Sequence, residues 1–564
     1  MVHHLCGYWA RFCPAIFQIF LFFLFTLIAP IHSNAASADS FKTNEYWSST
    51  GLDFIHAADA YALGYTGAGT ALGIIDSSVR ADHPELAGKV IMMALPLDET
   101  TGQEYVPNWA YDRHGSHVAG IMAAMRNGVG MHGVAFDADL VSAGMLGGAS
   151  GSTENLVTPD LLSLFAAYPE IRVINNSWGA DFYPSLDPAK DIPADVISAQ
   201  DNAIKALCKL SEEYGKVVVF AAGNSTMIAP SVEGMMPRYV PDLKGWINVV
   251  SLNIAGITTA TDGTRTIGPS GVSYFSNLGS KASLWTVAAP GSYINSLNAA
   301  TNGYMLASGT SMAAPYVSGT VGLVAQAFPW MTGKQLADAV LTTADNTFVA
   351  PTHLVQYTSD NAGNLNKVII TVIDPSVLPL NNTTIKQWID QVYQGATADA
   401  LKALVDQGKS AVNNLTREEV FGQGLLDAGK AVRGIARLDA NRMSASDVMT
   451  LPELGSGNYA LETFDTKGYF AEFSNDISER QWKDAYHHDD FKAGADATAL
   501  RGKDVGLRKT GDGLLVLSGV NSYSGATVVD GGGLAVSKKA DGTGGVLQNS
   551  DVLVRQGGVL LGDG

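Results

Sequence analysis

Short, mainly apolar runs recur along the first 345 residues and alternate with segments of helical character. The runs are Ala71–Ile75, Leu140–Ala143, Val173–Asn175, Val217–Ala221 and Ile247–Ser251. Apolar runs of this length predict strands buried on both faces, and parallel strands need helical crossovers between them. Residues 40–345 are therefore predicted to form an α/β fold, a doubly wound parallel sheet with helices on both faces.

Three segments between or after these runs have helical character. Ser116–Met125 and Pro193–Tyr214 are predicted helices, and the second has apolar residues at helical spacing. Ala313–Phe328 is long, apolar and rich in small residues. A helix that is apolar on all sides belongs in the interior, so this segment is predicted to be a central buried helix.

Composition excludes several classes of protein. The 564 residues contain 36 Lys and Arg against 54 Asp and Glu, a formal charge of −18. A chain this acidic has little to neutralise phosphates, so no nucleic-acid partner is expected. Hydrophobic residues make up 46% of the chain, which argues against a mainly disordered protein.

The N-terminus has the pattern of a signal peptide. The apolar segment Ala15–Ile28 follows Arg11 and is too short for an ordinary membrane span, although an uncleaved anchor is the alternative. Cleavage near Ala36 would leave Cys208 as the one remaining cysteine, so no intramolecular disulfide is expected. An exported protein without disulfides suggests a bacterial product.

The texture of the sequence changes twice after residue 345. A strand-like run, Lys367–Asp374, lies in an apparent insertion, and the α/β pattern resumes at Phe421–Val432. From Gly506, apolar and polar residues alternate between frequent glycines, which predicts the rungs of a β-solenoid that is still running at Gly564. The sequence is therefore expected to be a fragment. The predicted division is a signal peptide (1–36), an α/β unit (37–346), an insertion (347–418), the C-terminal part of the α/β unit (419–437), a linker region (438–505) and truncated solenoid repeats (506–564).

Two local motifs contain residue types that serve in catalysis. Asp76 ends a buried apolar run, where a carboxylate is either functional or caps the next turn. His114 stands at a predicted helix start in HGSHVAG, where a buried structural histidine is the plain alternative. His114 and His117 together suggest a metal site, but no third ligand cluster accompanies them.

Ser311 lies where a glycine-containing turn enters the long apolar helix. The serine is either an N-cap or a nucleophile beside helix N–H groups, which favour developing negative charge. A serine nucleophile needs a base, and the base needs a carboxylate to orient it. Asp76, His114 and Ser311 supply these roles in that chain order.

The segments around these residues, IIDSSVRADHPEL, HGSHVAG and GTSMAAP, resemble the three signatures of the subtilisin-like (subtilase) serine peptidases. The resemblance covers about residues 45–345 and 421–432. It implies a subtilisin-like fold and an Asp76, His114 and Ser311 triad. It also implies that Asn224, in VVVFAAGNS, helps to bind the oxyanion, whereas the plain alternative is a turn residue after a strand.

The same resemblance implies substrate-binding residues. Ser177, Trp178 and Gly179, in INNSWGA, would pair with the peptide backbone, and Ala222 and Gly223 would line the specificity pocket. The alternative for Trp178 is an ordinary place in the core. The expected partners are protein or peptide substrates, among them the protein's own junctions if it processes itself.

Two departures from the family concern calcium. Glu85 stands where many members have aspartate, and the loop Met125–Met131 is shorter than the family's calcium loop. No cofactor is expected to be required, and a structural calcium ion, although compatible with the family, is not supported by this sequence.

The glycine-rich segment resembles the β-helical stalk of bacterial autotransporter passengers. This resemblance implies the start of a right-handed β-helix, an outer-membrane β-barrel translocator beyond residue 564, and a location at the bacterial surface or outside the cell. Since no long pro-segment separates Ala36 from the α/β unit near Asn44, the β-helical segment is expected to serve as a folding scaffold. An adhesin or structural passenger with an inactive peptidase scaffold is the main alternative function. A lipase or esterase is disfavoured because Ser311 lacks a G-x-S-x-G setting.

Overall fold

The computed structural model describes residues 36–95, 107–108, 112–144, 159–179, 202–240, 242–359, 365–393, 402–403, 405–406, 412–455, 457–484 and 495–563. The predicted signal peptide lies outside this part of the chain, apart from Ala36. In the described part, no helix combines the length and apolar character that a membrane crossing requires.

Seven parallel strands form the central sheet, in the order β2-β3-β1-β4-β5-β6-β9. They are β1 (Ala71–Asp76), β2 (Val90–Ala94), β3 (Asp139–Gly144), β4 (Ile171–Asn176), β5 (Val217–Ala221), β6 (Trp246–Leu252) and β9 (Thr286–Pro290). The predicted parallel α/β sheet is confirmed, and all five predicted strands are present. Sequence analysis missed β2, an edge strand with alternating exposure, and β9, which has no long apolar run.

Helices cover both faces of this sheet. Gly322 of α9 (Thr310–Ala327) lies against Leu72, and Phe165 of α5 (Pro159–Ala167) lies against Gly73. Because consecutive strand residues point to opposite faces, α9 and α5 lie on opposite sides of β1. Helix α9 confirms the predicted central helix, since nearly all of it is buried.

The other predicted helices differ in their bounds. Helix α4 (His114–Ala123) begins two residues before the predicted start, and α7 (Asn202–Glu212) corresponds to the second half of the predicted 193–214 helix. Residues 193–201 lie outside the described residues. The remaining elements of the α/β unit are α2 (Asn44–Ser48), α3 (Ala57–Ala62), α8 (Met236–Tyr239), α10 (Gly333–Thr343), α13 (Arg417–Phe421), α14 (Ala428–Ala431) and the hairpins β7 (Ile257–Thr259) with β8 (Arg265–Ile267) and β10 (Ile294–Asn298) with β11 (Gly303–Ala307).

The insertion has its own small core. Strands β12 (His353–Ser359), β13 (Leu365–Val372) and β14 (Val412–Asn414) form a sheet, and α11 (Asn382–Val392) packs on it through Ile385 and Ile389. Strand β13 corresponds to the predicted run at 367–374. The chain leaves and returns at one point, where Asp345 and Leu425 exchange two backbone hydrogen bonds of 2.8 and 2.9 Å.

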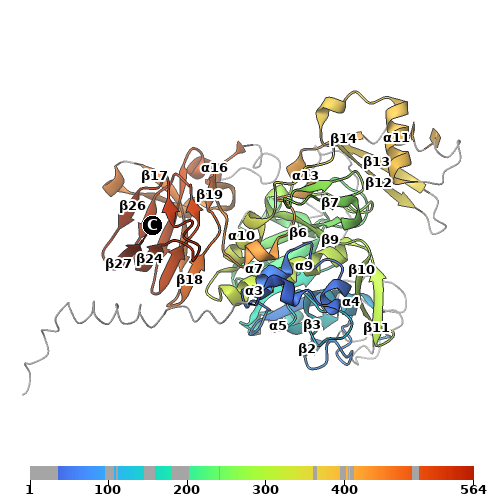
Figure 1. The fold of residues 1–564 in the computed structure, drawn as a ribbon, viewed down its shortest axis with the longest axis horizontal. Helices are drawn as coiled ribbons and strands as arrows, with labels where there is room; N and C mark the ends of the chain where they lie inside the picture. Colours follow the sequence, from blue (N-terminus) through green and yellow to red (C-terminus); the bar gives the residue numbers. More distant parts are fainter. Residues whose placement is uncertain are drawn as a thin grey trace, which may run out of the picture.

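Parallel strands stack in three columns in the C-terminal part, which Figure 1 shows in red. The columns are β17 (Asn458–Asp465), β20 (Asp504–Thr510), β23 (Thr527–Val529) and β26 (Val552–Val554); β18 (Phe470–Phe473), β21 (Leu514–Leu517), β24 (Gly532–Val536) and β27 (Gly558–Gly562); and β22 (Val520–Asn521) with β25 (Val546–Leu547). Strand β16 (Val448–Thr450) adds to the first column, antiparallel to β17, and α16 (Ala495–Leu500) and the pair β15 (Arg437–Asp439) with β19 (Ser478–Arg480) lie nearby. The columns begin at β17 and β18, inside the segment expected as a linker (438–505). The sequence analysis did not recognise these two strands, because single strands carry too little periodicity to reveal a repeat.

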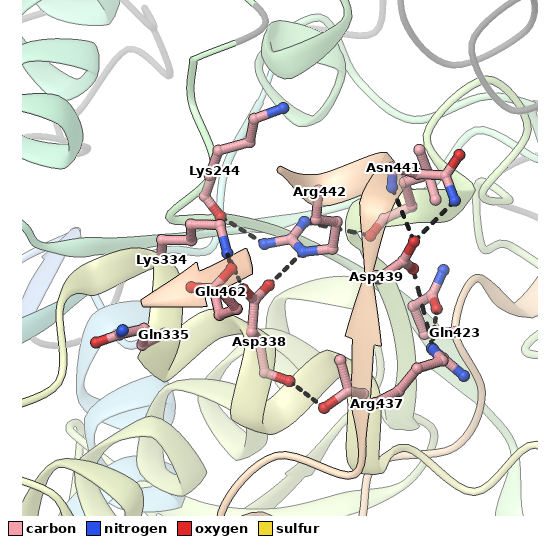
Figure 2. Close-up of polar contacts among 12 residues, drawn as sticks. Lys244, Lys334, Gln335, Asp338, Gln423, Arg437, Asp439, Asn441, Arg442 and Glu462 are labelled. Atoms are coloured by element: carbon pink, nitrogen blue, oxygen red, sulfur yellow. Dashed lines mark hydrogen bonds and ion pairs between the residues drawn. The ribbon is translucent and has the colours of Figure 1, made fainter. Parts of the chain in front are cut away.

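Aromatic residues and buried charges join these strands to the α/β unit. Phe328, at the end of α9, and Trp330 pack on Phe473 with ring centroids 5.5 and 6.2 Å apart. Beside them, α10 contributes ions that pair with the C-terminal strands, as Figure 2 shows. Lys334 bonds both Asp338 (2.7 Å) and Glu462 of β17 (2.5 Å).

Arg442 completes this ion cluster. Its guanidinium donates to the Asp338 carboxylate and, at 2.6 Å, to the backbone carbonyl of Lys244. The side chains of Asp338 and Arg442 are almost fully buried. Burial raises the pKa of Asp338, but the charges of Arg442 and Lys334 outweigh it and hold the pKa below its ordinary value. Asp338 therefore stays ionised beside Arg442 and Lys334, whereas burial raises the pKa of Glu462 above its ordinary value.

Candidate active site

The carboxyl edge of the central sheet gathers the candidate site. Strands β1 and β4 are neighbours, and the chain leaves β1 toward β2 but leaves β4 toward β5, in the opposite direction along the sheet. Ligands of such sheets bind beyond the carboxyl ends of the strands at that point. Asp76 is the last residue of β1, and Ser177 and Ala222 directly follow β4 and β5. The topology thus places three separate segments at one edge.

Asp76 and His114 are in direct contact. Asp76 Oδ1 lies 2.7 Å from His114 Nδ1 and accepts a second hydrogen bond of 2.7 Å from the Ser77 N–H. The helix that carries His114 approaches the strand closely at Gly115, where a Cβ would lie only 2.0 Å from the Ser77 carbonyl oxygen. Glycine is required there, and it lets α4 hold the imidazole over the buried carboxylate.

The Asp76 carboxylate sets the proton affinity of His114. Burial lowers the pKa of the imidazole, but the charge of Asp76 and its hydrogen bond outweigh burial, so the pKa of His114 is raised above its ordinary value. Since Asp76 bonds to Nδ1, the other ring nitrogen, Nε2, remains for proton exchange.

Ser311 is the second residue of α9 and is largely buried. Its hydroxyl donates a 3.0 Å hydrogen bond to the backbone carbonyl of Ser177, and the Ser177 hydroxyl donates a 2.9 Å bond to the backbone carbonyl of Ser311. Within the described residues the Ser311 hydroxyl makes no hydrogen bond to His114. A rotation about the Cα–Cβ bond redirects the hydroxyl, and such bonds are often not formed before substrate binds.

Asn224 is exposed and held in one orientation by Thr310. Its side-chain oxygen accepts hydrogen bonds from the backbone N–H of Thr310 (2.9 Å) and from the Thr310 hydroxyl (3.0 Å). The amide nitrogen, a donor only, is thereby directed away from Thr310. Ser311 N–H belongs to the first turn of α9, where backbone donors have no partner within the helix. Thr310 therefore orients the asparagine. The sequence analysis did not select this residue, although its position next to Ser311 in the GTSMAAP motif could have indicated a role in the site.

The five predicted substrate-binding residues lie beside this centre with different local roles. Ser177 contacts Ser311 as described, and the N–H of Gly223 donates to the Thr310 hydroxyl (3.1 Å). The backbone groups of Ala222 bond to other strands and loops. Gly179 lies against Ser231.

Trp178 packs inward. Its indole nitrogen donates to the Ile75 carbonyl (3.0 Å), and its ring meets Phe220 edge-on at 5.1 Å. These contacts favour the core interpretation that the sequence analysis left open for this residue. Its backbone still follows Ser177 along the edge of the site.

Glu45 and Glu85 hold the loop Met125–Met131 through hydrogen bonds. The carboxylate of Glu45 accepts the backbone N–H groups of Asn127 and Gly128, at 2.8 and 2.9 Å. Glu85 accepts the Tyr304 hydroxyl and the Asn127 amide. These carboxylates therefore position the loop, and the absence of a cofactor requirement stays a prediction.

His117 does not extend the site. It is buried, its Nε2 bonds to the Met305 carbonyl at 3.1 Å, and burial lowers its pKa to about 4. Among the described residues no group of three or more His, Cys, Asp or Glu side chains could hold a metal ion. His117 is therefore a neutral structural histidine.

Comparison with known proteins agrees with this geometry. Residues 67–367, more than half of the chain, match the Subtilase family, and residues 507–536 match the passenger-associated transport repeat. The chain belongs to the subtilase family, and it carries an autotransporter passenger repeat.

Several curated proteins are similar to the α/β part. An extracellular serine protease of Serratia marcescens is 30% identical over 363 residues, which cover 55% of this chain and 33% of that protein. Subtilisin DY of Bacillus licheniformis is 28% identical over 300 residues, 52% of this chain and 91% of that protein. Thermitase of Thermoactinomyces vulgaris is 29% identical over 290 residues, 50% and 83% respectively. The chain spans about a third of the length of the Serratia protein.

Proposed function

We propose that this protein is a secreted or surface-displayed serine endopeptidase. The observation that carries the proposal is the 2.7 Å contact between Asp76 and His114, at the same sheet edge as Ser311 and Asn224. The raised pKa of His114 supports its role as a base, because the imidazolium formed during the reaction is stabilised by Asp76.

The proposed reaction proceeds in two stages. His114 takes the proton of the Ser311 hydroxyl as Ser311 Oγ attacks the peptide carbonyl, and it then gives this proton to the amine of the leaving peptide. An acyl-enzyme remains on Ser311. Water attacks the ester, again with His114 as base, and Ser311 regains its proton when the acid product leaves. Asp76 orients His114 and stays ionised throughout.

The oxyanion formed in each stage is proposed to bind two donors. They are the amide nitrogen of Asn224 and the backbone N–H of Ser311. The bonds from Thr310 to the Asn224 oxygen fix this amide before substrate arrives, so little reorganisation is needed at the moment of reaction. The substrate backbone is proposed to lie along Ser177–Gly179, with Ala222 and Gly223 beside the reacting residue.

We also propose that the C-terminal strands are the first turns of a right-handed β-helix and that the chain is the passenger part of an autotransporter. The parallel register of the three columns and the repeat at residues 507–536 support this interpretation. Export by a signal peptide, a β-barrel translocator in the outer membrane and processing of the chain's own junctions are parts of the same proposal. The functional units keep the expected order, except that the β-helix is proposed to begin at β17.

Covalent labelling tests the proposed function. The full chain and the variant Ser311→Ala are treated with a fluorophosphonate, and the labelled peptide is mapped by mass spectrometry. Labelling at Ser311 in the parent and none in Ser311→Ala is the expected result. A parent chain that is folded, as judged by circular dichroism, but does not react would overturn the proposal in favour of an inactive passenger.

A further inference from the structure

A cavity of about 370 Å³ lies between the α/β unit and the insertion. The carboxyl edge of the central sheet supplies one wall, through Asn253 after β6 and Ser292 after β9. The insertion supplies another, through Tyr357 of β12 and Gln391 of α11. The cavity thus opens on the same sheet edge as the proposed active site.

Hydrogen bonds tie this cavity to the segment that leads into α9. Ser308, which lines the cavity, lies three residues before Ser311, and its hydroxyl accepts the backbone N–H of Tyr293 at 2.8 Å. The next residue, Gly309, donates its N–H to the Gly291 carbonyl at 2.9 Å. The wall of the cavity and the N-terminus of the Ser311 helix are therefore one connected structure.

The geometry of the sheet gives the distance from Ser311 to the cavity. Ser177, which holds the Ser311 hydroxyl, follows β4, and Ser292 follows β9, three strands further along the sheet. Three strand spacings are about 14 Å, and an extended peptide advances about 3.3 Å per residue. A peptide that crosses Ser311 away from Ser177 therefore reaches the cavity within about four residues.

The described lining is uncharged and includes three tyrosines, beside three valines and five polar side chains. Tyr274 and Tyr357 stack with ring centroids 4.4 Å apart and planes 6° apart. Tyr293 is 65% exposed and has a left-handed backbone conformation, with φ of 56°, which is strained for a tyrosine. A charged guest would lose water without gaining a counter-ion, whereas an aromatic ring would gain stacking and buried area.

We propose that this cavity is a specificity pocket for an aromatic side chain of the substrate, two to four residues from the scissile bond on the side away from Ser177. The proposal rests on the proposed peptidase function. It assigns the insertion a role, since Tyr357 and Gln391 belong to it. The insertion would therefore select substrates by a residue remote from the bond that is cut.

Cleavage-site profiling tests the pocket. The full chain digests a library of peptides derived from a whole proteome, and mass spectrometry of the products identifies the residues on both sides of each cut. Phe, Tyr and Trp are expected to be enriched about tenfold at one position on the side away from Ser177. The variants Tyr357→Ala and Tyr293→Ala are expected to reduce this enrichment to less than about twofold, with the enrichments on the opposite side unchanged.

Each comparison is made within one variant, so any change in the amount of folded enzyme cancels. The control Tyr214→Ala removes an exposed tyrosine outside the cavity and should keep the enrichment. A flat profile on that side, a preference for Lys or Arg, or an aromatic preference that survives Tyr357→Ala would overturn the pocket. Fluorophosphonate labelling separates the two proposals: labelling with a flat profile rejects only the pocket, and the absence of labelling rejects the peptidase as well.

Discussion

The hydroxyl of Ser311 donates its hydrogen to the backbone carbonyl of Ser177, 3.0 Å away. Ser177 begins the segment proposed to pair with the peptide backbone. A substrate N–H that binds the Ser177 carbonyl competes for the same acceptor and releases the hydroxyl to turn toward His114. Substrate arrival and activation of the nucleophile would then be coupled through one carbonyl group.

We expect this coupling to appear in the reactivity of Ser311. A fluorophosphonate extended by a peptide amide that reaches Ser177 should show a saturating labelling rate two- to tenfold above that of the unextended reagent, the factor for one hydrogen bond. The matched control has the same amide N-methylated, so it cannot donate. Equal saturating rates for the N–H and N-methyl reagents, measured by stopped-flow fluorescence, would contradict the coupling.

The raised pKa of His114 gives opposite pH dependences for activity and stability. Only the neutral imidazole is a base, so activity should rise with pH, with a midpoint above the ordinary histidine value of about 6.5. The folded chain holds the proton more tightly than the unfolded chain. The stability from the His114–Asp76 pair is therefore complete below about pH 6.5 and is lost as pH rises through the raised pKa. Peptide hydrolysis and urea denaturation across pH 5–9 measure the two effects.

Substitution of Asp76 provides the check on this assignment. Asp76→Asn should lower kcat by about 10⁴ and move the activity midpoint to lower pH, because the carboxylate that raises the pKa of His114 is gone. The control Asp82→Asn removes an exposed carboxylate and should leave the profile as it is. A midpoint that stays in place in Asp76→Asn would show that another group titrates.

Asn224→Ala should lower kcat by about 10²–10³ with little change in KM, because the amide is proposed to bind the oxyanion and not the ground state. Thr310→Val keeps the shape of the threonine but removes the hydroxyl that orients Asn224. It should reduce kcat by less, about two- to tenfold for one hydrogen bond, and Thr310→Ser should restore it. A large change in KM without a change in kcat would indicate a binding role instead.

The ion cluster at the junction should be essential for stability. Arg442→Ala leaves the buried Asp338 with Lys334 as its remaining charged partner, and we expect a loss of about 3–5 kcal/mol in the free energy of unfolding. The control Arg501→Ala removes an exposed partner of Asp484 and should cost less than about 1 kcal/mol. Urea denaturation followed by tryptophan fluorescence measures both variants, and equal losses would show that burial of the cluster has no energetic weight.

Deletion of residues 506–564 should impair folding of the α/β unit. The deletion removes most of β20 and all of the strands beyond it, among them β21. Strands β17 and β18 thereby lose their pairing partners β20 and β21, and β17 and β18 carry Glu462 and Phe473 at the junction. Refolding from urea, followed by fluorophosphonate labelling, should give at most about a tenth of the labelled yield of the full chain. Full recovery of labelling in the truncated chain would reject the scaffold role.

The sequence predicts best those features whose local composition allows one structural interpretation. The buried strand β5 and the helix α9 are apolar on all sides, and their positions were predicted correctly. Asp76, His114 and Ser311 stood out because their roles depend on one another, and the structure places Asp76 and His114 in contact.

Other features depend on tertiary contacts that no local pattern contains. Strands β17 and β18 lie in the segment expected as a linker, because their partners are strands 40 or more residues later. Strand β2 is different: its sequence, VIMMA, is an apolar run that the sequence analysis did not select, and its residues alternate between half-buried and exposed. The orienting role of Thr310 and the inward packing of Trp178 depend likewise on residues distant in sequence.

The backbone bridge between Asp345 and Leu425 has an evolutionary consequence. Eighty positions separate two residues that are hydrogen-bonded neighbours, so the segment between them begins and ends at one place in the α/β unit. Loop-closure entropy grows only slowly with length, so segments of very different size fit between the same two anchors at similar cost. Genetic exchange at this bridge would change which proteins are cut while the cutting residues stay as they are.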